Sequence, residues 1–309
     1  MGKASRTKQD TSRRERIAAQ RAAARRREQR RRILIASTAI VAVVAVVVVL
    51  VVIKTTSKNG TVAQAGNGPT GAALTSLTNQ VTGVPASVLG QVGGGSIGGG
   101  GFSKVSGPPL TAGGKPEMLY IGAEYCPYCA AERWAMIVAL SRFGTFSGLT
   151  TTHSSSSDAY ANTPTWTFYG SSYSSKYVAF SSVEETKNYR QGNSTSQNVQ
   201  YVPLQTPTAE QQALITKYDP GTGGQGGSIP FIDIGNKYVE IGNLQPFGPQ
   251  DLQGKTWSQV AAAMNQPSSA IAKGVDGSAN YLTAALCKLT GNQPASACTP
   301  AVKALEAKL

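Results

Sequence analysis

Two of the four cysteines stand in a pattern suited to redox chemistry. Cys126-Pro127-Tyr128-Cys129 separates two thiols by two residues, so the second thiol can close back onto the first. A thiolate is the nucleophile in disulfide exchange, and the first cysteine therefore needs a lowered pKa. The N-terminus of a helix supplies it, because unpaired N–H groups and the positive end of the helix dipole stabilise an anion. Pro127 suits the first helical position, since its missing N–H would have no partner there.

The sequence around this motif predicts a strand before it and a helix after it. Met118–Ile121 is a short apolar run that ends at Gly122, as expected for a buried strand. Ala130–Phe143 repeats apolar residues at helical spacing and ends before Gly144. The dithiol is therefore predicted at a strand-to-helix junction.

The remaining elements predict an α/β fold in which helices cover both faces of a mixed sheet. Further strands are expected in short runs rich in β-branched or aromatic residues, namely Leu149–His153, Trp166–Tyr169, Tyr177–Phe180, Ile229–Ile234 and Tyr238–Ile241. The last two flank Gly235-Asn236-Lys237, a short hairpin connection. Helices are expected at Thr208–Tyr218, with Thr208 as the cap, and at Thr256–Met264. Residues 268–309 are predicted to form a helical C-terminal extension.

The positive charge of the chain lies in its N-terminal tail. The net charge is +13, but residues 1–32 alone carry +10 and the other 277 residues carry only +3. A strongly basic balance often indicates a nucleic-acid partner, and this distribution argues against one for the folded part. We therefore expect a basic cytoplasmic tail over residues 1–32 and no nucleic-acid partner.

Residues 33–53 predict a single transmembrane helix. This run of 21 residues is apolar except for Ser37 and Thr38. As a helix it would span about 32 Å, enough to cross the hydrocarbon core. It is rich in valine, but a lone strand in lipid would leave its backbone groups unpaired, so the helix is favoured. The positive-inside rule places the tail in the cytoplasm and the chain from Lys54 onward outside.

Two alternatives to this topology stay open. A cleaved signal peptide would use Ala63-Gln64-Ala65, but the apolar run is long for a signal peptide and this site lies about ten residues beyond it. The basic tail could bind nucleic acid in its own right, although setting the topology and contacting anionic lipid head groups explain it more simply.

Residues 54–109 are predicted to form a glycine-rich tether to the membrane. They hold few large apolar residues and contain the glycine runs Gly93–Gly95 and Gly98–Gly101. Val81–Val92 has enough apolar content to dock onto the domain. The folded domain itself is predicted over residues 110–267.

All four cysteines lie on the outer side of the proposed membrane helix, where disulfides persist. Three pairings are possible, and the spacing favours Cys126 with Cys129 and Cys287 with Cys298. The second pair encloses ten residues that include a glycine and a proline, which predicts a structural disulfide between two helices. A second redox pair that passes electrons to the first stays open as an alternative.

The dithiol and its surroundings resemble a known superfamily. Glu117–Phe143 resembles the active-site strand and helix of the thioredoxin superfamily, and Cys-Pro-Tyr-Cys is the form common in glutaredoxins. The extracytoplasmic setting is similar to that of the DsbA-like thiol-disulfide oxidoreductases. More closely, residues 110–265 resemble a membrane-anchored thioredoxin-like family of unknown function. Ser228-Ile229-Pro230, just before the predicted hairpin, matches the cis-proline segment that faces the dithiol in the superfamily.

The resemblance implies a role for each residue of the site. Cys126 would be the attacking, solvent-facing thiol and Cys129 the resolving thiol. The residues that would line the substrate groove are Pro127, Tyr128, Ile229 and Pro230. The backbone of Ile229 would pair with an extended substrate segment. The resemblance also implies a membrane protein that reoxidises the dithiol, and no cofactor.

Two features depart from the superfamily pattern. Thioredoxins carry a buried, proton-relaying acid six residues before the first cysteine, where this chain has Tyr120; Glu124 or water could serve instead. The 104 positions between Cys126 and Pro230 also exceed those of a minimal thioredoxin. The Ser/Tyr-rich stretch 150–208 would form either a substrate surface or an exposed excursion.

The function predicted from these features is a membrane-anchored extracytoplasmic thiol-disulfide oxidoreductase. It would act as a disulfide donor or isomerase on cysteine-containing exported proteins. The alternative is a thioredoxin-like binding module without turnover, or a copper or zinc carrier that uses the same thiols. His153, the only histidine, could join them as a copper ligand, but a lone histidine in a Ser-rich stretch is more often a surface residue. The proline in the first pair and the spacing of the second argue against zinc, and no metal is expected.

Overall fold

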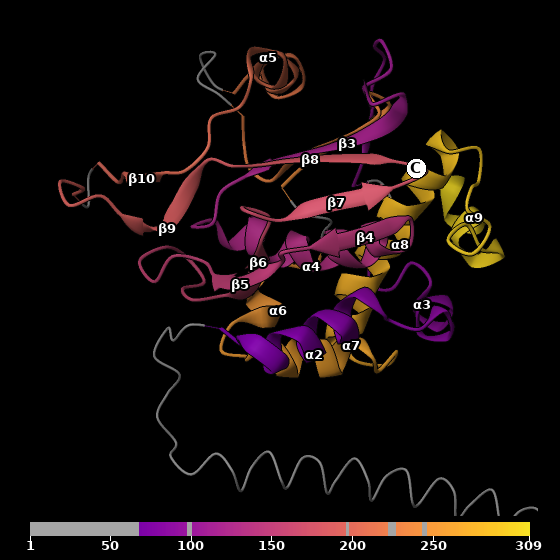
Figure 1. Cartoon of the computed structure of the whole chain (residues 1–309), viewed down its shortest axis with the longest axis horizontal. Helices are drawn as coiled ribbons and strands as arrows, with labels where there is room; N and C mark the ends of the chain where they lie inside the picture. Colours follow the sequence, from indigo (N-terminus) through magenta and orange to yellow (C-terminus); the bar gives the residue numbers. More distant parts are fainter. Residues whose placement is uncertain (1–67, 98–100, 196–197, 222–226, 243–245) are drawn as a thin grey trace, which may run out of the picture. The chain divides into compact units, whose positions relative to one another are not determined.

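The strand predicted before the dithiol lies in the middle of a six-stranded mixed sheet (Figure 1). The computed structural model describes residues 68–97, 101–195, 198–221, 227–242 and 246–309. Strand β3 (Lys115–Gly122) pairs in parallel with β8 (Ala179–Glu184) and antiparallel with β11 (Phe231–Ile234). The sheet is completed by β12 (Tyr238–Ile241) and β1 (Ser103–Lys104) beyond β11, and by β2 (Thr111–Ala112) against the start of β3. The mixed sheet predicted from the sequence is confirmed.

Alternate residues of β3 serve the two faces of this sheet. Met118 and Tyr120 belong to the large apolar core, whereas Leu119 and Ile121 belong to a smaller one that includes Ile215. This two-residue alternation is the natural period of a strand. A strand that is apolar on both faces needs cover on both sides, and helices on both faces supply it.

The larger core is built around two buried helices. Helix α4 (Pro127–Ser141) packs against α8 (Ala270–Leu289). Every residue from Cys129 to Leu140 and from Gly274 to Cys287 is buried. The other helices on this side are α2 (Gly71–Thr82), α3 (Ala86–Val92), α6 (Pro249–Leu252), α7 (Trp257–Met264) and α9 (Pro300–Glu306). Helix α5 (Ala209–Tyr218) covers the opposite face through Ile215.

Capping residues explain where two of the predicted helices begin. Thr208 accepts a hydrogen bond from the N–H of Gln211, and Thr256 accepts one from Gln259; each glutamine side chain binds back to the N–H of its threonine. Such a reciprocal capping box satisfies donors that a helix leaves unpaired at its first turn. The prediction of helices at Thr208–Tyr218 and Thr256–Met264 is confirmed.

The prediction of a tether over residues 54–109 is wrong for residues 71–97. This segment forms α2 and α3, which pack against α4, α7 and α8. Leu77 and Val81 lie one helical turn apart and are buried, so a few well-spaced apolar residues suffice to dock α2. Residues 54–67 lie outside the described part of the chain.

The glycine run that suggested a flexible linker instead permits close packing. A Cβ on Gly277 of α8 would lie 2.8 Å from the carbonyl oxygen of Gly94, so the two backbones approach as only glycine allows. Asn280 of the same helix donates hydrogen bonds to the carbonyls of Leu89 and Gly93, at 2.9 and 2.8 Å. The segment is therefore fixed to α8 by hydrogen bonds from the Asn280 side chain to its backbone carbonyls.

Apart from β8, which joins the central sheet, the strands of the Ser/Tyr-rich insert and the preceding β4 form three small two-stranded sheets. The pairs are β4 (Gly144–Ser147) with β7 (Ser172–Ser175), β5 (Thr150–His153) with β6 (Pro164–Thr167), and β9 (Thr186–Arg190) with β10 (Tyr201–Pro203). The strands predicted at Leu149–His153 and Trp166–Tyr169 correspond to β5 and β6. The strand expected at Tyr177–Phe180 begins later, at Ala179, and continues to Glu184 as β8.

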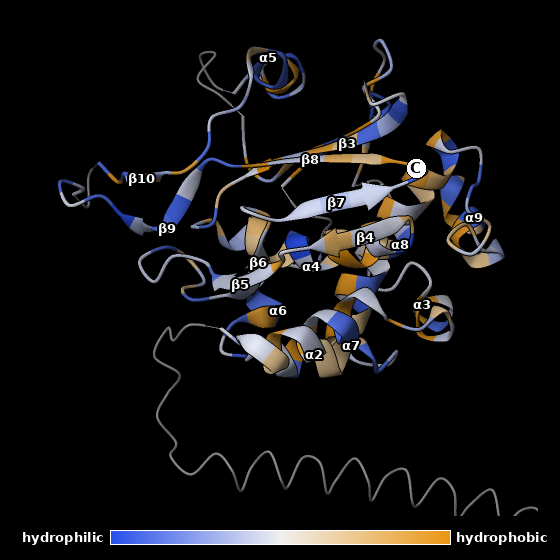
Figure 2. Ribbon diagram, in the orientation of Figure 1, coloured by the Kyte–Doolittle hydropathy of each residue, from blue (hydrophilic) through white to orange (hydrophobic). Residues whose placement is uncertain are grey.

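Part of this insert is bound directly to α4. Thr165 donates a 2.7 Å hydrogen bond to the carbonyl of Ala130, and the indole N–H of Trp134 donates to the carbonyl of Pro164 at 2.9 Å. By contrast, Figure 2 shows β9 in hydrophilic colours, and β9 and β10 lie at the periphery in Figure 1. The insert is thus part core and part exposed ribbon.

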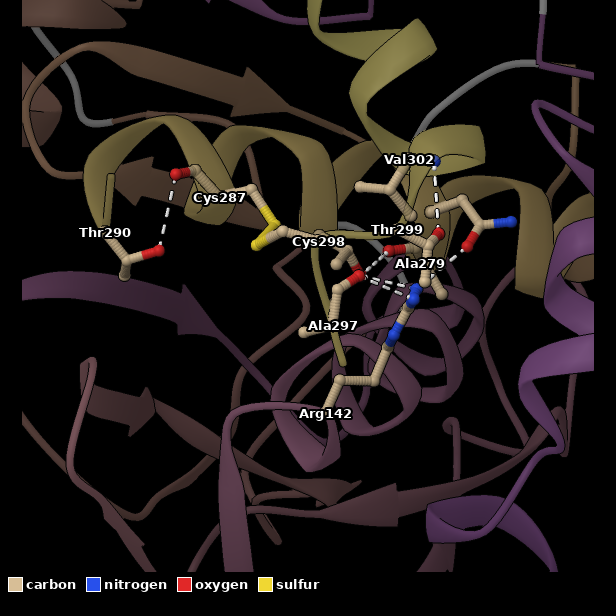
Figure 3. The surroundings of a disulfide bond; sticks show 10 residues. Arg142, Ala279, Cys287, Thr290, Ala297, Cys298, Thr299 and Val302 are labelled. Atoms are coloured by element: carbon tan, nitrogen blue, oxygen red, sulfur yellow. Dashed lines mark hydrogen bonds between the residues drawn. A yellow bond between two sulfur atoms is a disulfide. The ribbon is translucent and has the colours of Figure 1, made fainter. Parts of the chain in front are cut away.

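The C-terminal segment is helical, as predicted, and belongs to the same compact unit as the sheet. Cys287 and Cys298 form a disulfide between the end of α8 and the turn before α9 (Figure 3). Arg142, at the end of α4, donates a 2.8 Å hydrogen bond to the carbonyl of Ala297. The disulfide and Arg142 together hold this turn against the core.

The predicted tail and membrane helix, residues 1–53, lie outside the described residues. Among the helices that the structure does describe, none is both long enough and apolar enough to cross a membrane.

Replacing Cys287 and Cys298 together by serine should destabilise the protein. The bond closes a loop with a sequence separation of 11, and both cysteines are buried. Loop-closure entropy in the unfolded chain then accounts for roughly 3 kcal/mol. Denaturant unfolding of the variant beside wild type measures the loss, with Cys126→Ser as the control. Equal midpoints for the double variant and wild type would contradict a structural role.

Candidate active site

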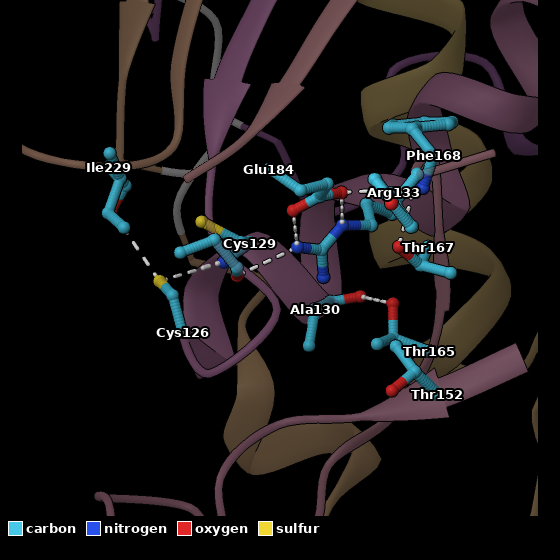
Figure 4. A network of polar contacts seen from close by, with 12 residues as sticks. Cys126, Cys129, Ala130, Arg133, Thr152, Thr165, Thr167, Phe168, Glu184 and Ile229 are labelled. Atoms are coloured by element: carbon cyan, nitrogen blue, oxygen red, sulfur yellow. Dashed lines mark hydrogen bonds and ion pairs between the residues drawn. The ribbon is translucent and has the colours of Figure 1, made fainter. Parts of the chain in front are cut away.

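The two thiols of the motif meet at the N-terminus of α4 (Figure 4). Cys126 is the N-cap residue, Pro127 takes the first helical position, and the N–H of Cys129 donates to Cys126 Sγ at 3.3 Å. Both thiols are free; Cys126 is 5 % exposed and Cys129 is 0 % exposed. The predicted strand-to-helix junction is confirmed, and Cys126 is the more accessible of the two sulfurs.

The segment that contains Ile229 and Pro230 faces the dithiol from the next strand of the sheet. The Ile229–Pro230 peptide bond is cis. The Cys126 thiol donates to the carbonyl oxygen of Ile229 at 3.7 Å, across 103 positions of sequence. The structure therefore brings Ile229 and Pro230 to the thiols, and leaves Tyr128 exposed beside them.

The surroundings of the two thiols push their pKa values apart. A hydrogen bond from the Cys129 thiol lowers the pKa of Cys126, aided by backbone N–H groups of Cys129 and Tyr128 and by the charge of Arg133. Burial raises the pKa of Cys129, and the neighbouring Cys126 sulfur raises it further. When the reduced pair loses a proton, the negative charge therefore falls on Cys126 and the remaining proton on Cys129, which suits Cys126 as the nucleophile.

A buried ion pair beneath the thiols was not predicted from the sequence. Arg133 of α4 donates to Glu184 of β8 through Nε at 2.8 Å and Nη2 at 2.6 Å, and Nη2 also donates to the carbonyl of Ala123 at 2.8 Å (Figure 4). Both side chains are 0 % exposed. Burial opposes the charge of Arg133, but Glu184 together with Tyr120 and Cys129 outweighs this effect and raises the pKa of Arg133. The site thus has a permanent cation in a low-dielectric environment.

The hydroxyl of Tyr120 lies beside Cys129, where thioredoxins carry an acid. A Cβ on Gly122 would lie 2.1 Å from Tyr120 Oη and 3.0 Å from Cys129 Sγ, so both atoms border the space that this glycine leaves open. Tyr120 is fully buried and its hydroxyl has no hydrogen-bond partner. Glu124, the other residue considered for a proton relay, is half-buried in the loop before the dithiol.

Tyrosine rings from the insert surround the dithiol loop. Tyr125 stacks on Tyr201 of β10 with ring centroids 4.0 Å apart, and Tyr128 meets Tyr160 edge to face at 6.1 Å. The N–H of Ser155 donates to the carbonyl of Tyr125 at 2.9 Å. The insert therefore shapes the surface next to Cys126.

Metal binding receives no support from the described residues. Within them, no group of three or more His, Cys, Asp or Glu side chains is placed to hold an ion. His153 Nδ1 lies 2.7 Å from the carbonyl of Ser154, and Cys287 and Cys298 are bonded to each other. The three-ligand copper site and the four-cysteine zinc site considered from the sequence are therefore not formed.

A mixed sheet flanked by helices, with an adjacent cysteine pair at a helix N-terminus, is consistent with a thioredoxin-like fold. The chain belongs to the family described as "Domain of unknown function (DUF929)", whose model matches residues 101–288. That range includes the whole central sheet, α4 and the Cys126–Cys129 pair. No curated protein and no solved structure matches the chain. The family description assigns no activity, so the function is argued from the site.

Gly122→Ala should disturb both the core and the dithiol. The new methyl group would collide with the Tyr120 ring and crowd Cys129 Sγ. Overpacking of this kind typically costs about 1–3 kcal/mol. Denaturant unfolding and the reaction rate of the free thiols measure the two effects.

Gly90→Ala is the matched control for this substitution. Gly90 lies in α3 with open space around the position of a Cβ, so alanine should be neutral or slightly stabilising. Similar behaviour of the two variants would contradict the close approach of Tyr120 and Cys129 around Gly122.

Proposed function

We propose that the chain is a membrane-anchored extracytoplasmic thiol-disulfide oxidoreductase that acts on cysteine-containing exported proteins. The observation that carries the proposal is the asymmetry of the two thiols. Cys126 caps a helix, accepts the N–H of Cys129 and has a lowered pKa, while Cys129 is enclosed and has a raised one. An inert disulfide needs no such separation, whereas thiol exchange needs one stable thiolate and one protonated reserve.

As a disulfide donor, the protein would start from a Cys126–Cys129 disulfide. A substrate thiolate attacks Cys126 Sγ, the bond between Cys126 and Cys129 breaks, and Cys129 leaves as a thiolate that takes up a proton. A second substrate thiolate then attacks the substrate sulfur of the mixed disulfide and releases Cys126 as a thiolate. Two electrons pass from the substrate, which becomes a disulfide, to the protein, which becomes a dithiol.

As an isomerase, the protein would start from the dithiol. The Cys126 thiolate attacks a substrate disulfide and forms a mixed disulfide, leaving a free substrate thiolate. That thiolate attacks another disulfide of the substrate, and a later attack returns Cys126, so no net electrons are transferred. If the substrate stalls, Cys129 attacks Cys126 Sγ and releases the substrate in reduced form.

The substrate would bind on the surface next to Cys126. The carbonyl of Ile229 already accepts a hydrogen bond from the Cys126 thiol, so an extended substrate strand can compete for the same backbone group. The exposed ring of Tyr128 and its neighbour Tyr160 add apolar area beside it. Binding mainly through the substrate backbone, with few contacts to substrate side chains, suits a protein that acts on substrates of many different sequences.

The proposed location follows from the sequence of the N-terminal region. A transmembrane helix at residues 33–53, preceded by the basic tail, would place the dithiol outside the cytoplasm. There the donor cycle requires an electron acceptor, for which we propose a membrane protein that presents an oxidised disulfide to the Cys126–Cys129 dithiol.

Cys126→Ser should abolish disulfide exchange by the full chain. Without the Cys126 sulfur the mixed disulfide with the substrate cannot form, so turnover should fall to the background rate of the uncatalysed exchange. The assays are insulin reduction and oxidative refolding of a reduced substrate, with the chain purified in mild detergent. Turnover by Cys126→Ser at the wild-type rate would overturn the proposal.

The variant with serine at both 287 and 298 is the control for these assays. The disulfide that this variant lacks is buried in the C-terminal turn of the wild-type protein. The variant should therefore exchange disulfides at the wild-type rate while it remains folded. Loss of turnover in the folded control would instead favour the second pair as a redox partner of the first.

The topology predicts where a reporter fused to Leu309 is active. An alkaline phosphatase that needs its own disulfides should be active in a bacterial host, because the fusion point would lie in an oxidising compartment. Deletion of residues 33–53 should abolish that activity while leaving the fusion protein expressed. Equal activity with and without residues 33–53 would contradict the proposed anchor.

A further inference from the structure

We propose that the buried guanidinium of Arg133, held in place by Glu184, and the hydroxyl of Tyr120 together stabilise the thiolate of Cys129, in place of the acid found in thioredoxins. The inference deepens the proposed function and rests on it. Arg133 and Glu184 act as positioning residues, because neither touches the substrate. Tyr120 lies next to the reacting sulfur itself.

The guanidinium of Arg133 is held against the residue that borders both thiols. Arg133 lies one helical turn after Cys129, and its Nη2 holds the carbonyl of Ala123. The same carbonyl accepts the N–H of Cys126 at 3.2 Å. The N–H of Ala123 in turn favours the Cys129 thiolate. Arg133 thus fixes the residue that borders both thiols, and its own charge favours the anionic form of each.

Burying these polar groups costs free energy of folding. A buried ion pair is seldom more stabilising than apolar residues of similar volume, because both charges must leave water. Here Arg133 Nη1 is also buried without a hydrogen-bond partner, and so is the hydroxyl of Tyr120. Unsatisfied buried donors typically cost about 1–3 kcal/mol each. A buried ion pair and two unsatisfied buried donors near one thiol, kept at this cost, indicate a role in its chemistry.

The Cys129 thiolate takes part both when the protein donates its disulfide and when a mixed disulfide is resolved. When a substrate attacks the Cys126–Cys129 disulfide, Cys129 is the leaving group; when a mixed disulfide is resolved, Cys129 is the nucleophile. In each case negative charge develops on a fully buried sulfur, where water cannot stabilise it. Arg133 supplies the compensating charge, and the unpartnered Tyr120 hydroxyl can donate a hydrogen bond to the anion.

Glu184 keeps this cation from acting too strongly. Its carboxylate accepts two hydrogen bonds from Arg133 and offsets part of that charge, while burial raises the pKa of the Cys129 thiol. The ionisable groups around Cys129 are Tyr120 from β3, Glu184 from β8, Cys126 and Arg133 from α4, and Tyr125 from the loop before it. Removing either partner of the pair should therefore shift the titration of Cys129, in opposite directions.

The experiment measures Cys129 alone, in the full chain with Cys126→Ser. Carbon NMR of isotope-labelled cysteine follows the thiol as a function of pH, and the disulfide-bonded Cys287 and Cys298 do not titrate. Arg133→Met should raise the pKa of Cys129 and Glu184→Gln should lower it, each by about one unit, a tenfold change in thiolate fraction. In the chain with both thiols, the pH profile of exchange should move in the same directions.

Arg142→Met is the matched control. Arg142 ends the same helix and donates hydrogen bonds to Asn280, Thr283 and Ala297, away from the thiols. Its loss should lower stability and leave the Cys129 titration unchanged. Arg133→Lys keeps the charge and should restore most of the wild-type titration, which also serves if Arg133→Met does not fold.

Shifts in the same direction for Arg133→Met and Glu184→Gln, or shifts no larger than that of Arg142→Met, would overturn the inference. The titration does not require turnover, so its failure is distinguishable from failure of the proposed function. Opposite shifts in a chain that exchanges no disulfides would support the charge pair and refute the oxidoreductase. Normal disulfide exchange without these pKa shifts would support the oxidoreductase and refute the role of the charge pair.

Discussion

Burial of α4 on every side is the constraint on which the rest of the structure depends. A dithiol at a helix N-terminus works only if the helix cannot move relative to the strand that holds the cis-proline segment. Core residues of the sheet pack against one side of α4, α8 lies along it, and α2 and strand β6 close the remaining sides. Hydrogen bonds from Thr165 and Trp134 attach β6 to α4, and Arg142 attaches its end to the C-terminal turn. Segments that look peripheral in the sequence are the cover of this one helix.

The strand-to-helix junction, the hairpin and the capped helices could be predicted because local patterns determine them. Periodicity places Met118–Ile121 and α4, and threonine caps start α5 and α7. The docking of Val81–Val92 could be predicted from its apolar content, but the full extent of α2 and its packing could not, because the close approach of this segment to α8 does not show in the composition. Gly94 and Gly277 resemble linker residues until the opposing backbone is known. The buried half of the insert was hidden in the same way, since Trp166 is one apolar residue among many polar ones.

The charged pair beneath the thiols shows where reasoning from sequence stops. Glu132 and Arg133 follow the dithiol in a helix, and charged residues there normally mark the solvent-facing side. In a helix that is buried all round this rule has no solvent side to apply to, so Arg133 must find its partner inside. That partner, Glu184, lies 51 positions away on a strand parallel to β3. The one available signal was a charged pair within an otherwise apolar helix that begins with two cysteines.

A tyrosine at position 120, rather than a carboxylic acid, limits how protons can move at this site. A buried carboxyl can accept the proton of the resolving thiol, whereas burial raises the pKa of Tyr120 and keeps its hydroxyl protonated. Tyr120 can therefore donate a hydrogen bond that favours the Cys129 anion. The proton that the Cys129 thiol loses must leave by another route. A fixed cation with a hydroxyl donor stabilises the thiolate by preorganised electrostatics, without a group that changes its own charge during the reaction. Such a site would favour Cys129 as a leaving group and as a nucleophile equally, and the electron acceptor would then decide the direction of exchange.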